Sequence, residues 1–252
     1  MESVSKHKVV CLGASIVRGQ VSYNFVKLLD QRMTKSGFQF INAGIAGDQA
    51  YNVLMRLDSV IAYHPDFVII LVGTNDVTAT LSPTLARISR MTRRFPQPPS
   101  PKFYQDNMLR IVRRLKEQTS AKIALISLPV LGEDLESISN QRVREYNALL
   151  KEIACREKVS YLPVYERQEE YLRKAQQGRG RPYEGGMLSM KALIRHFLLR
   201  QSFDEISMNN HFLLMTDGIH MNSRGATFIT DEIKSFLESL RDICAADASF
   251  QK

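Results

Sequence analysis

The chain has 252 residues, of which 44% are hydrophobic and 24% are charged, and its formal net charge is +8. This composition is typical of a globular protein, and the length is sufficient for one sizeable core or two small ones. No apolar run reaches the ~18 residues that a membrane span needs, and no export signal precedes the first apolar run. We therefore expect a cytoplasmic protein whose residues 1–252 form a single domain.

Five short apolar runs follow one another along the chain, and each ends at a glycine, an asparagine or a proline. They cover residues 9–12, 38–41, 67–72, 123–128 and 159–162. Apolar runs of this length are typical of strands that are buried on both faces, as in a parallel sheet. The pattern therefore predicts five parallel strands.

Segments with apolar residues at helical spacing alternate with these runs. They cover residues 25–33, 108–115, 143–153 and 228–240. Alternation of strands and helices predicts a doubly wound α/β sheet with right-handed crossovers. Ligands of such sheets bind beyond the carboxyl ends of the strands, so the residues that follow each strand become the candidates for a functional site.

Two segments depart from this alternation. Residues 95–101 are rich in proline, which predicts a loop or an extended connector. Residues 165–215 are longer than an ordinary connection and contain several glycines and a helical pattern over 187–198. We interpret residues 165–215 as an insertion near the site, either a candidate lid or an ordinary packing helix.

Basic residues are concentrated in two stretches, 87–122 and 173–200. Such stretches attract anionic partners or steer anionic substrates, and they also occur as solvated helix faces. The chain contains no tryptophan and no recognised nucleic-acid motif. We therefore predict no nucleic-acid partner. The three cysteines, at positions 11, 155 and 244, have no paired spacing and predict neither a disulfide nor a zinc site.

Ser15 directly follows the first predicted strand, within Gly13-Ala14-Ser15. A serine at this place faces the crevice, where the amides and dipole of the next helix favour negative charge. Serine at this position is also a common helix N-cap. The spacing of the glycines does not fit a P-loop, and the chain has no Gly-x-Ser-x-Gly elbow of an α/β-hydrolase.

Three further polar blocks follow later strands or lie near the C-terminus. Residues 42–48 include Gly47, residues 73–76 include Asn75, and residues 217–222 include Asp217 and His220. Each block alone has a plain structural interpretation as a strand end or a helix cap. Together with residues 13–19, and in this order, they resemble blocks one, two, three and five of the SGNH/GDSL hydrolase family over nearly the whole chain.

The resemblance implies a three-layer α/β/α fold with a five-stranded parallel sheet in flavodoxin-like order. It implies Ser15 as the nucleophile, His220 as the general base and Asp217 as the residue that orients the base. It further implies an oxyanion hole formed by the backbone amides of Ser15 and Gly47 and the side-chain amide of Asn75. Such a set provides base activation of a hydroxyl and preorganised donors for the developing oxyanion.

One position departs from the family pattern. The family's first block usually reads Gly-Asp-Ser, whereas Ala14 stands before Ser15 here. The missing aspartate supports the hydrogen-bond network of the family's site and is not its nucleophile. Its loss is compatible with lower activity or with a subfamily, because the serine, the donors and the His–Asp pair are all present.

The expected function is hydrolysis of a carboxylic ester through an acyl-serine intermediate, without a metal or a cofactor. The apolar and basic residues of the insertion favour an acyl chain beside an anionic head group, as in a lysophospholipid, and imply transient contact with a membrane surface. Alternatives are a carbohydrate O-deacetylase and a non-catalytic binding protein on the same fold. Nucleic-acid binding would rest on the basic stretches alone.

Overall fold

The computed structural model describes residues 6–93, 95–175 and 178–250. Its centre is a five-stranded, all-parallel sheet with the strand order β2-β1-β3-β4-β5. The strands are β1 (His7–Gly13), β2 (Phe38–Gly44), β3 (Phe67–Leu71), β4 (Lys122–Ile126) and β5 (Ser160–Leu162). The predicted parallel sheet and its flavodoxin-like order are confirmed.

The strands differ from the predicted apolar runs in two ways: one strand extends into polar residues, and two strands end before their apolar runs do. β2 continues through polar Asn42 to Gly44, because residues 42–44 pair with the last three residues of β1. β3 and β4 end one and two residues before their apolar runs do. Hydropathy marks buried positions, whereas the ladder of backbone hydrogen bonds decides where a strand stops.

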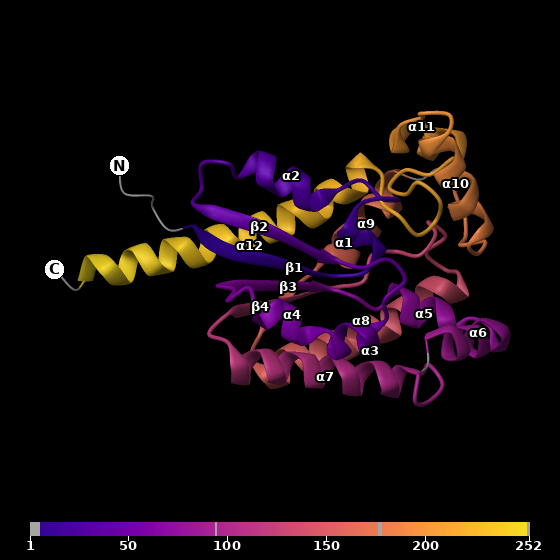
Figure 1. Ribbon diagram of the computed structural model, residues 1–252. Helices are drawn as coiled ribbons and strands as arrows, with labels where there is room; N and C mark the ends of the chain where they lie inside the picture. The colour runs from indigo at the N-terminus through magenta and orange to yellow at the C-terminus, as the bar shows by residue number, and fades with distance from the viewer. Residues whose placement is uncertain (1–5, 94, 176–177, 251–252) are drawn as a thin grey trace.

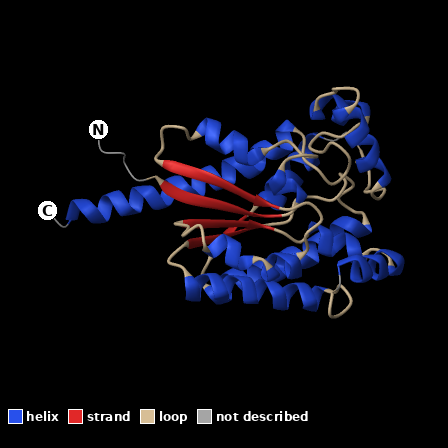
Figure 2. Ribbon diagram, in the orientation of Figure 1, coloured by secondary structure: helices blue, strands red, loops and turns tan. Residues whose placement is uncertain are grey.

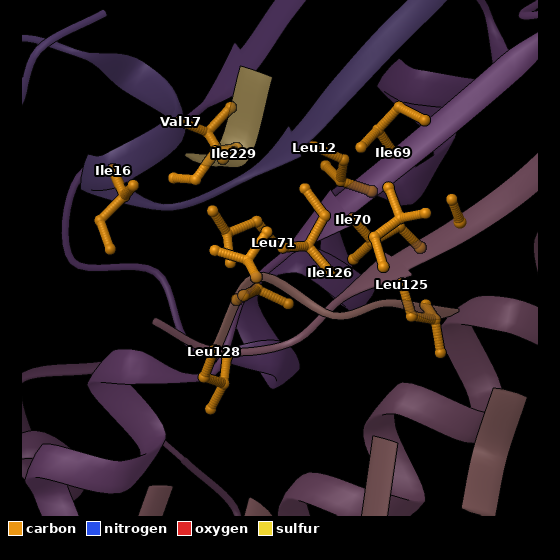
Figure 3. Close-up of a cluster of buried hydrophobic side chains, with 14 of the residues drawn as sticks. Leu12, Ile16, Val17, Ile69, Ile70, Leu71, Leu125, Ile126, Leu128 and Ile229 are labelled. Carbon is orange, nitrogen blue, oxygen red and sulfur yellow. The ribbon is translucent and has the colours of Figure 1, made fainter. Parts of the chain in front are cut away.

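The core forms where the central strands meet the helices. Leu12, Ile70 and Leu125 come from β1, β3 and β4, are at most 1% exposed, and lie in one apolar cluster (Figure 3). Leu12 pairs directly with Ile70, and Ile70 with Leu125. Burial on both faces explains why these strands read as nearly continuous apolar runs in the sequence.

Helices cover both faces of the sheet and complete three layers (Figures 1 and 2). One layer contains α2 (Phe25–Arg32), α9 (Val164–Ala175) and α12 (Ser223–Phe250), which packs against both. The other contains α3 (Ala50–Met55), α4 (Leu57–Ile61), α7 (Pro101–Gln118) and α8 (Ile138–Glu157). The α/β/α architecture is thus confirmed. No described helix is both long and apolar enough to cross a membrane.

Several short helices were absent from the sequence prediction. They are α5 (Thr74–Thr80), α6 (Pro83–Arg93) and α11 (Phe203–Asn209), together with α3, α4 and α9, whereas the helix expected to begin at Ser15 is the single turn α1 (Ser15–Arg18). Most of them are too short to show helical periodicity. The proline-rich connector is non-helical up to Ser100, which caps α7 by accepting a hydrogen bond from the amide of Phe103. Pro101 then occupies the first turn of α7, where a missing amide costs nothing.

Residues 165–215 contain most of α9, then α10 (Met187–Phe197) and α11. α9 packs against α12 within the helical layer, whereas α10 and α11 contact each other at the end of the molecule where the strands terminate (Figure 1). The part of this segment that extends beyond the three layers therefore begins after α9.

Gly44 allows the end of β2 to lie against α1. A Cβ atom at this position would overlap the backbone nitrogen of Arg18 and lie 2.9 Å from the carbonyl oxygen of Ala14. Asn42 strengthens the same contact, because its Nδ2 donates to the carbonyl of Val17 at 2.7 Å. The residues around Ser15 are thus held by backbone that tolerates no side chain at position 44.

We expect Gly44→Ala to lower the free energy of unfolding by about 1–3 kcal/mol, because backbone must shift to admit the methyl group. Urea unfolding measures the change. Gly186→Ala is the matched control, since a Cβ there would meet no heavy atom within 4 Å. Equal stability of the two variants would contradict the close packing of β2 on α1.

Candidate active site

Ser15 is the first residue of α1 and stands two residues beyond the end of β1. Its side chain is half-buried, at the edge of the sheet where all strands end. The carbonyl of Ala14 accepts the amide of Arg18 at 2.9 Å, which closes the single turn that follows. The turn presents the hydroxyl of Ser15 toward the loop that carries His220.

His220 connects Ser15 with Asp217. Its Nε2 lies 3.0 Å from the Oγ of Ser15, and its Nδ1 lies 2.7 Å from the Oδ2 of Asp217. Asp217 is 1% exposed and His220 7%. A carboxylate on Nδ1 requires the proton on that nitrogen and leaves Nε2 free to accept the proton of the serine hydroxyl. The geometry is that of a nucleophile, a base and the group that orients the base.

Asp217 also shapes the backbone that carries His220. Its Oδ1 accepts the backbone amides of Ile219 and His220, each at 2.9 Å. Burial alone would raise the pKa of Asp217, but the facing imidazole and these hydrogen bonds outweigh burial and hold the pKa below its ordinary value. Asp217 is therefore a carboxylate at neutral pH, as a partner of an imidazolium must be.

His220 lies in the loop between α11 and α12, called the histidine loop below, and this loop is fixed to the segment that follows α1. The amide of Tyr23 donates to the carbonyl of Met221 at 2.8 Å, and the amide of Met221 donates to the Oγ of buried Ser22 at 3.0 Å. These bonds connect segments about 200 residues apart in the chain. They set the position of His220 relative to Ser15.

Glu133 anchors the other end of the same loop, a role that sequence reasoning missed. Its carboxylate is 1% exposed and accepts the backbone amides of Leu213, Leu214 and Met215 at 2.6–3.2 Å. Burial raises its pKa, and the three amides and the positive charge of Arg224 oppose that rise. The sequence contains one signal for this role, since Glu133 is an acidic residue after an apolar strand, at the edge of the sheet where the strands end.

Gly47 lies on a loop that is hydrogen-bonded to Asn75, the second residue of α5. Gly47 lies in a turn closed by the amide of Asp48 and the carbonyl of Ile45, and the amide of Ile45 donates to Gly13 at 3.1 Å. The Nδ2 of Asn75 donates to the carbonyl of Asp48 at 2.9 Å. An amide carries two hydrogens, so one remains for a ligand. The helix caps are Gln49 for α3 and Gly73 for α5, not Asp48 or Asn75.

Partly buried Arg56 and buried Asp48 form an ion pair beside the turn of Gly47, with 2.7 Å between Nε and Oδ2. The Nη2 of Arg56 also donates to the carbonyls of Gly13 and Ala43, each at 3.0 Å. One guanidinium thus joins the ends of β1 and β2 to the turn of Gly47. Ala14 brings no carboxylate to this network, and Asp48 is its acidic member. This pair could not be predicted from a local pattern, because Arg56 lies between the short helices α3 and α4 and belongs to no motif.

Asp76 follows Asn75 and is buried, with both carboxyl oxygens 3.2–3.3 Å from the amide of Ala50 at the start of α3. Burial raises its pKa to about 8, although the backbone amides of Ala50 and Asp76 lower it in part. Asp76 is therefore mainly neutral at neutral pH. It connects the first turn of α5, which contains Asn75, to α3, the helix that follows Gly47.

A groove of about 810 Å³ opens beside the histidine loop. Leu81, Ile138, Tyr183 and Arg179 are among its lining residues, and Ser15 is not. Tyr183 lies next to Gly218 in the histidine loop, and the amide of Gly132 donates to the carbonyl of Gly218 at 2.7 Å. The groove has apolar walls and one exposed cation, Arg179, whose Nε lies 2.7 Å from the Oδ2 of buried Asp134.

The two described cysteine side chains have no catalytic setting. Cys11 is fully buried in β1, and burial raises the pKa of its thiol to about 12. Cys155 is exposed and unbridged on α8. The side chain of Cys244 lies outside the described set. Within that set no three His, Cys, Asp or Glu side chains form a cluster that could hold a metal ion.

Comparison with protein-family models decides the family. The model of the GDSL-like Lipase/Acylhydrolase family matches residues 11–227, which include all five candidate site residues. The chain belongs to this family. Its members, as the family description says, are lipases and acylhydrolases, so the sequence-based assignment to the GDSL hydrolases is confirmed. A search of curated proteins gives no significant match.

Solved structures of esterases share the fold of this GDSL-family chain. An acetyl xylan esterase, AlAXEase, is 18% identical with a TM-score of 0.65, over 90% of this chain and 98% of its own. Axe2, an acetylxylan esterase from Geobacillus stearothermophilus, is 18% identical with a TM-score of 0.65, over 92% and 94%. A lipase/acylhydrolase from Enterococcus faecalis is 19% identical with a TM-score of 0.61, over 92% and 96%.

The raised pKa of Asp76 predicts a pH-dependent stability. As pH rises above 3.8, the unfolded chain releases this proton, whereas the folded chain keeps it until about pH 8. Stability therefore falls over that window, by roughly 2 kcal/mol between pH 6 and pH 8. Asp76→Asn removes the titration. Between pH 6 and pH 8 we therefore expect the stability of the variant, relative to that of the unmodified protein, to rise by the same amount.

Urea unfolding at several pH values measures this change. Asp30→Asn, which replaces an exposed carboxyl on α2, is the control. A difference between Asp76→Asn and the unmodified protein that stays constant from pH 6 to pH 8 would contradict a neutral, buried Asp76.

Proposed function

We propose that the protein hydrolyses a carboxylic ester through an acyl intermediate on Ser15. The observation that carries the proposal is the chain of contacts from Ser15 through His220 to Asp217, at 3.0 and 2.7 Å. Membership of a family of lipases and acylhydrolases supports the reaction class. One solved structure of Axe2 is of a catalytic mutant in which a serine is replaced by alanine, and this is consistent with a serine nucleophile on this fold.

In the acylation step, the Nε2 of His220 takes the proton of Ser15 as its Oγ attacks the ester carbonyl carbon. The resulting oxyanion accepts hydrogen bonds from the amides of Ser15 and Gly47 and from the Nδ2 of Asn75. His220 then gives its proton to the leaving alcohol, and the C–O bond to the alcohol breaks. Asp217 stabilises the imidazolium between these two proton transfers.

In the deacylation step, a water molecule replaces the alcohol. His220 takes a proton from this water, whose oxygen attacks the acyl carbon, and the same donors stabilise the second oxyanion. The bond to the Oγ of Ser15 breaks as His220 returns the proton to Ser15. The acid is released, and the site is restored without any external co-reactant other than water.

Two substrate classes have support. Acetyl xylan esterases with the same fold favour an acetyl ester of a carbohydrate. The groove beside Tyr183, with Leu81 and Ile138 in its walls and Arg179 at its surface, favours an acyl chain next to an anionic head group. Hydrolysis of a series of p-nitrophenyl esters separates the two classes, because a deacetylase loses activity sharply beyond the acetyl ester.

We expect Ser15→Ala to lower kcat for p-nitrophenyl acetate by more than about 10³-fold, because the nucleophile is removed. The stability of the variant should be nearly unchanged, since the hydroxyl is half-buried and not part of the core. Ser235→Ala, at an exposed position on α12, is the control and should retain full activity. Full activity of folded Ser15→Ala would exclude the acyl-serine mechanism and favour a non-catalytic binding protein as the function of this site.

We expect Asn75→Ala to lower kcat by about 10²–10³-fold with a smaller change in KM, because the lost donor acts mainly on the transition state. Steady-state kinetics measure both constants, and thermal unfolding checks the loop that Asn75 holds through Asp48. If the variant instead raised KM and left kcat unchanged, Asn75 would be a binding residue and no part of the oxyanion hole.

A further inference from the structure

α10 exposes a stripe of large apolar side chains to solvent. Met187, Met190, Ile194, Phe197 and Leu198 are each 50–78% exposed. Their spacing of three, four and three residues, with Leu198 following Phe197, places them on one side of the helix. An apolar stripe normally faces the core of a globular protein, and an exposed one marks a surface that another body covers.

The opposite side of α10 is already used in packing. Ala192 is 4% exposed, and Leu188 packs against the main core. His196 stacks on Phe203 of α11 with 4.0 Å between ring centroids, and its Nδ1 lies 2.8 Å from the carbonyl of Gln201. α10 is thus held on one side, and the exposed stripe is the side that the fold leaves uncovered.

α6 also exposes large apolar side chains, and it lies at the same end of the molecule as α10 (Figure 1). Ile88 and Met91 are 51% and 70% exposed, one helical turn apart. Arg87 and Arg90 are exposed beside them. α6 follows directly after α5, the helix that contains Asn75, and contacts it.

Neither α6 nor α10 contains an acidic residue, whereas Glu184 precedes α10, and Asp204 and Glu205 lie in the first turn of the neighbouring α11. Residues 77–101 contain four arginines, residues 185–203 contain three Lys or Arg residues, and neither segment contains an aspartate or a glutamate. In α10 itself, Lys191 lies four residues after Met187 and three before Ile194, within the apolar stripe. A long basic side chain can extend to an anionic group while its methylenes stay among apolar neighbours.

We propose that the exposed stripe of α10, together with Ile88, Met91 and the arginines of α6, is a docking face for an anionic lipid bilayer. Apolar side chains of this kind enter the boundary between head groups and acyl chains, and basic side chains contact the anionic head groups. A second copy of this chain would bring the same positive charge against the face, which opposes self-association. The charge of the face is complementary to an anionic surface.

The position of the docking face extends the proposed function, on which this step rests. The groove with Arg179 and Tyr183 lies between Ser82, which leads into α6, and Pro182, which precedes α10. Docking would therefore place the groove at the bilayer surface, where an ester-linked acyl chain with an anionic head group can enter it. The substrate class is then an amphipathic lipid ester.

Vesicle sedimentation in the Ser15→Ala background tests the docking face without any dependence on turnover. The probes are vesicles of phosphatidylcholine alone and of phosphatidylcholine with phosphatidylglycerol. We expect binding to the mixed vesicles at low salt, weaker binding at high salt, and little binding to phosphatidylcholine alone. Ile194→Gln with Phe197→Gln should weaken binding to mixed vesicles by about tenfold or more, because two apolar anchors are lost.

The matched control is Met55→Gln with Tyr63→Gln, which removes two apolar side chains that are 63% and 44% exposed, at the end of α3 and after α4, outside the proposed face. It should bind as the Ser15→Ala protein does. Thermal unfolding shows whether each variant is folded. The dependence of vesicle binding on lipid charge and on salt is measured on the Ser15→Ala protein itself and needs no further variant.

Three results would overturn the docking face. They are absence of binding to mixed vesicles at low salt, equal loss of binding in the control variant, and dimers in solution that the α10 variant abolishes. Vesicle binding that depends on α10, in a protein whose esterase activity did not depend on Ser15, would support the docking face and reject the acyl-serine mechanism. The two proposals can thus fail separately.

Discussion

All five strands run in the same direction, and this constraint places the candidate site. Each strand delivers its following turn to one edge of the sheet, so residues from distant parts of the chain meet there. Ser15 follows β1, the turn of Gly47 follows β2, and Asn75 follows β3. His220 comes from no strand end. Its loop is held against this edge by Ser22 and by Glu133, which follows β4.

Buried charge holds this edge together. Asp217, Asp48 and Glu133 are each at most 5% exposed, and each accepts hydrogen bonds from a backbone amide, an imidazole or a guanidinium. A buried carboxylate without such partners would be costly, so each one fixes the loop that supplies its donors. Arg56 has the corresponding role among cations, because it joins two strand ends to the turn of Gly47. The conformations of these loops are thus set by hydrogen bonds to buried charged side chains and not by regular secondary structure.

The sequence predicted the parallel strands and the long helices, because their apolar patterns record which side of each element is buried, whereas the strand order came from the resemblance to the SGNH/GDSL family. It also pointed to Ser15 and His220, since strand ends and short motifs are local patterns. It missed Arg56 and Glu133, whose roles depend on partners 43 and 80 or more residues away. It missed the short α6 for a related reason, since two exposed apolar residues among arginines do not resemble a helix that packs on a core. Arg56 and Glu133 belong to no short motif, so a single sequence does not show which distant backbone groups they bind.

The most direct test of the account is to identify the covalent intermediate. The unmodified protein is mixed with p-nitrophenyl acetate, quenched in acid within the first turnover, and analysed by mass spectrometry as the intact chain and as peptides. The acyl-serine mechanism predicts one acetyl group per chain, located on Ser15 and absent from Ser15→Ala. Rapid release of p-nitrophenol with the acetyl group on another residue, or with no acetylated protein at any quench time, would contradict it.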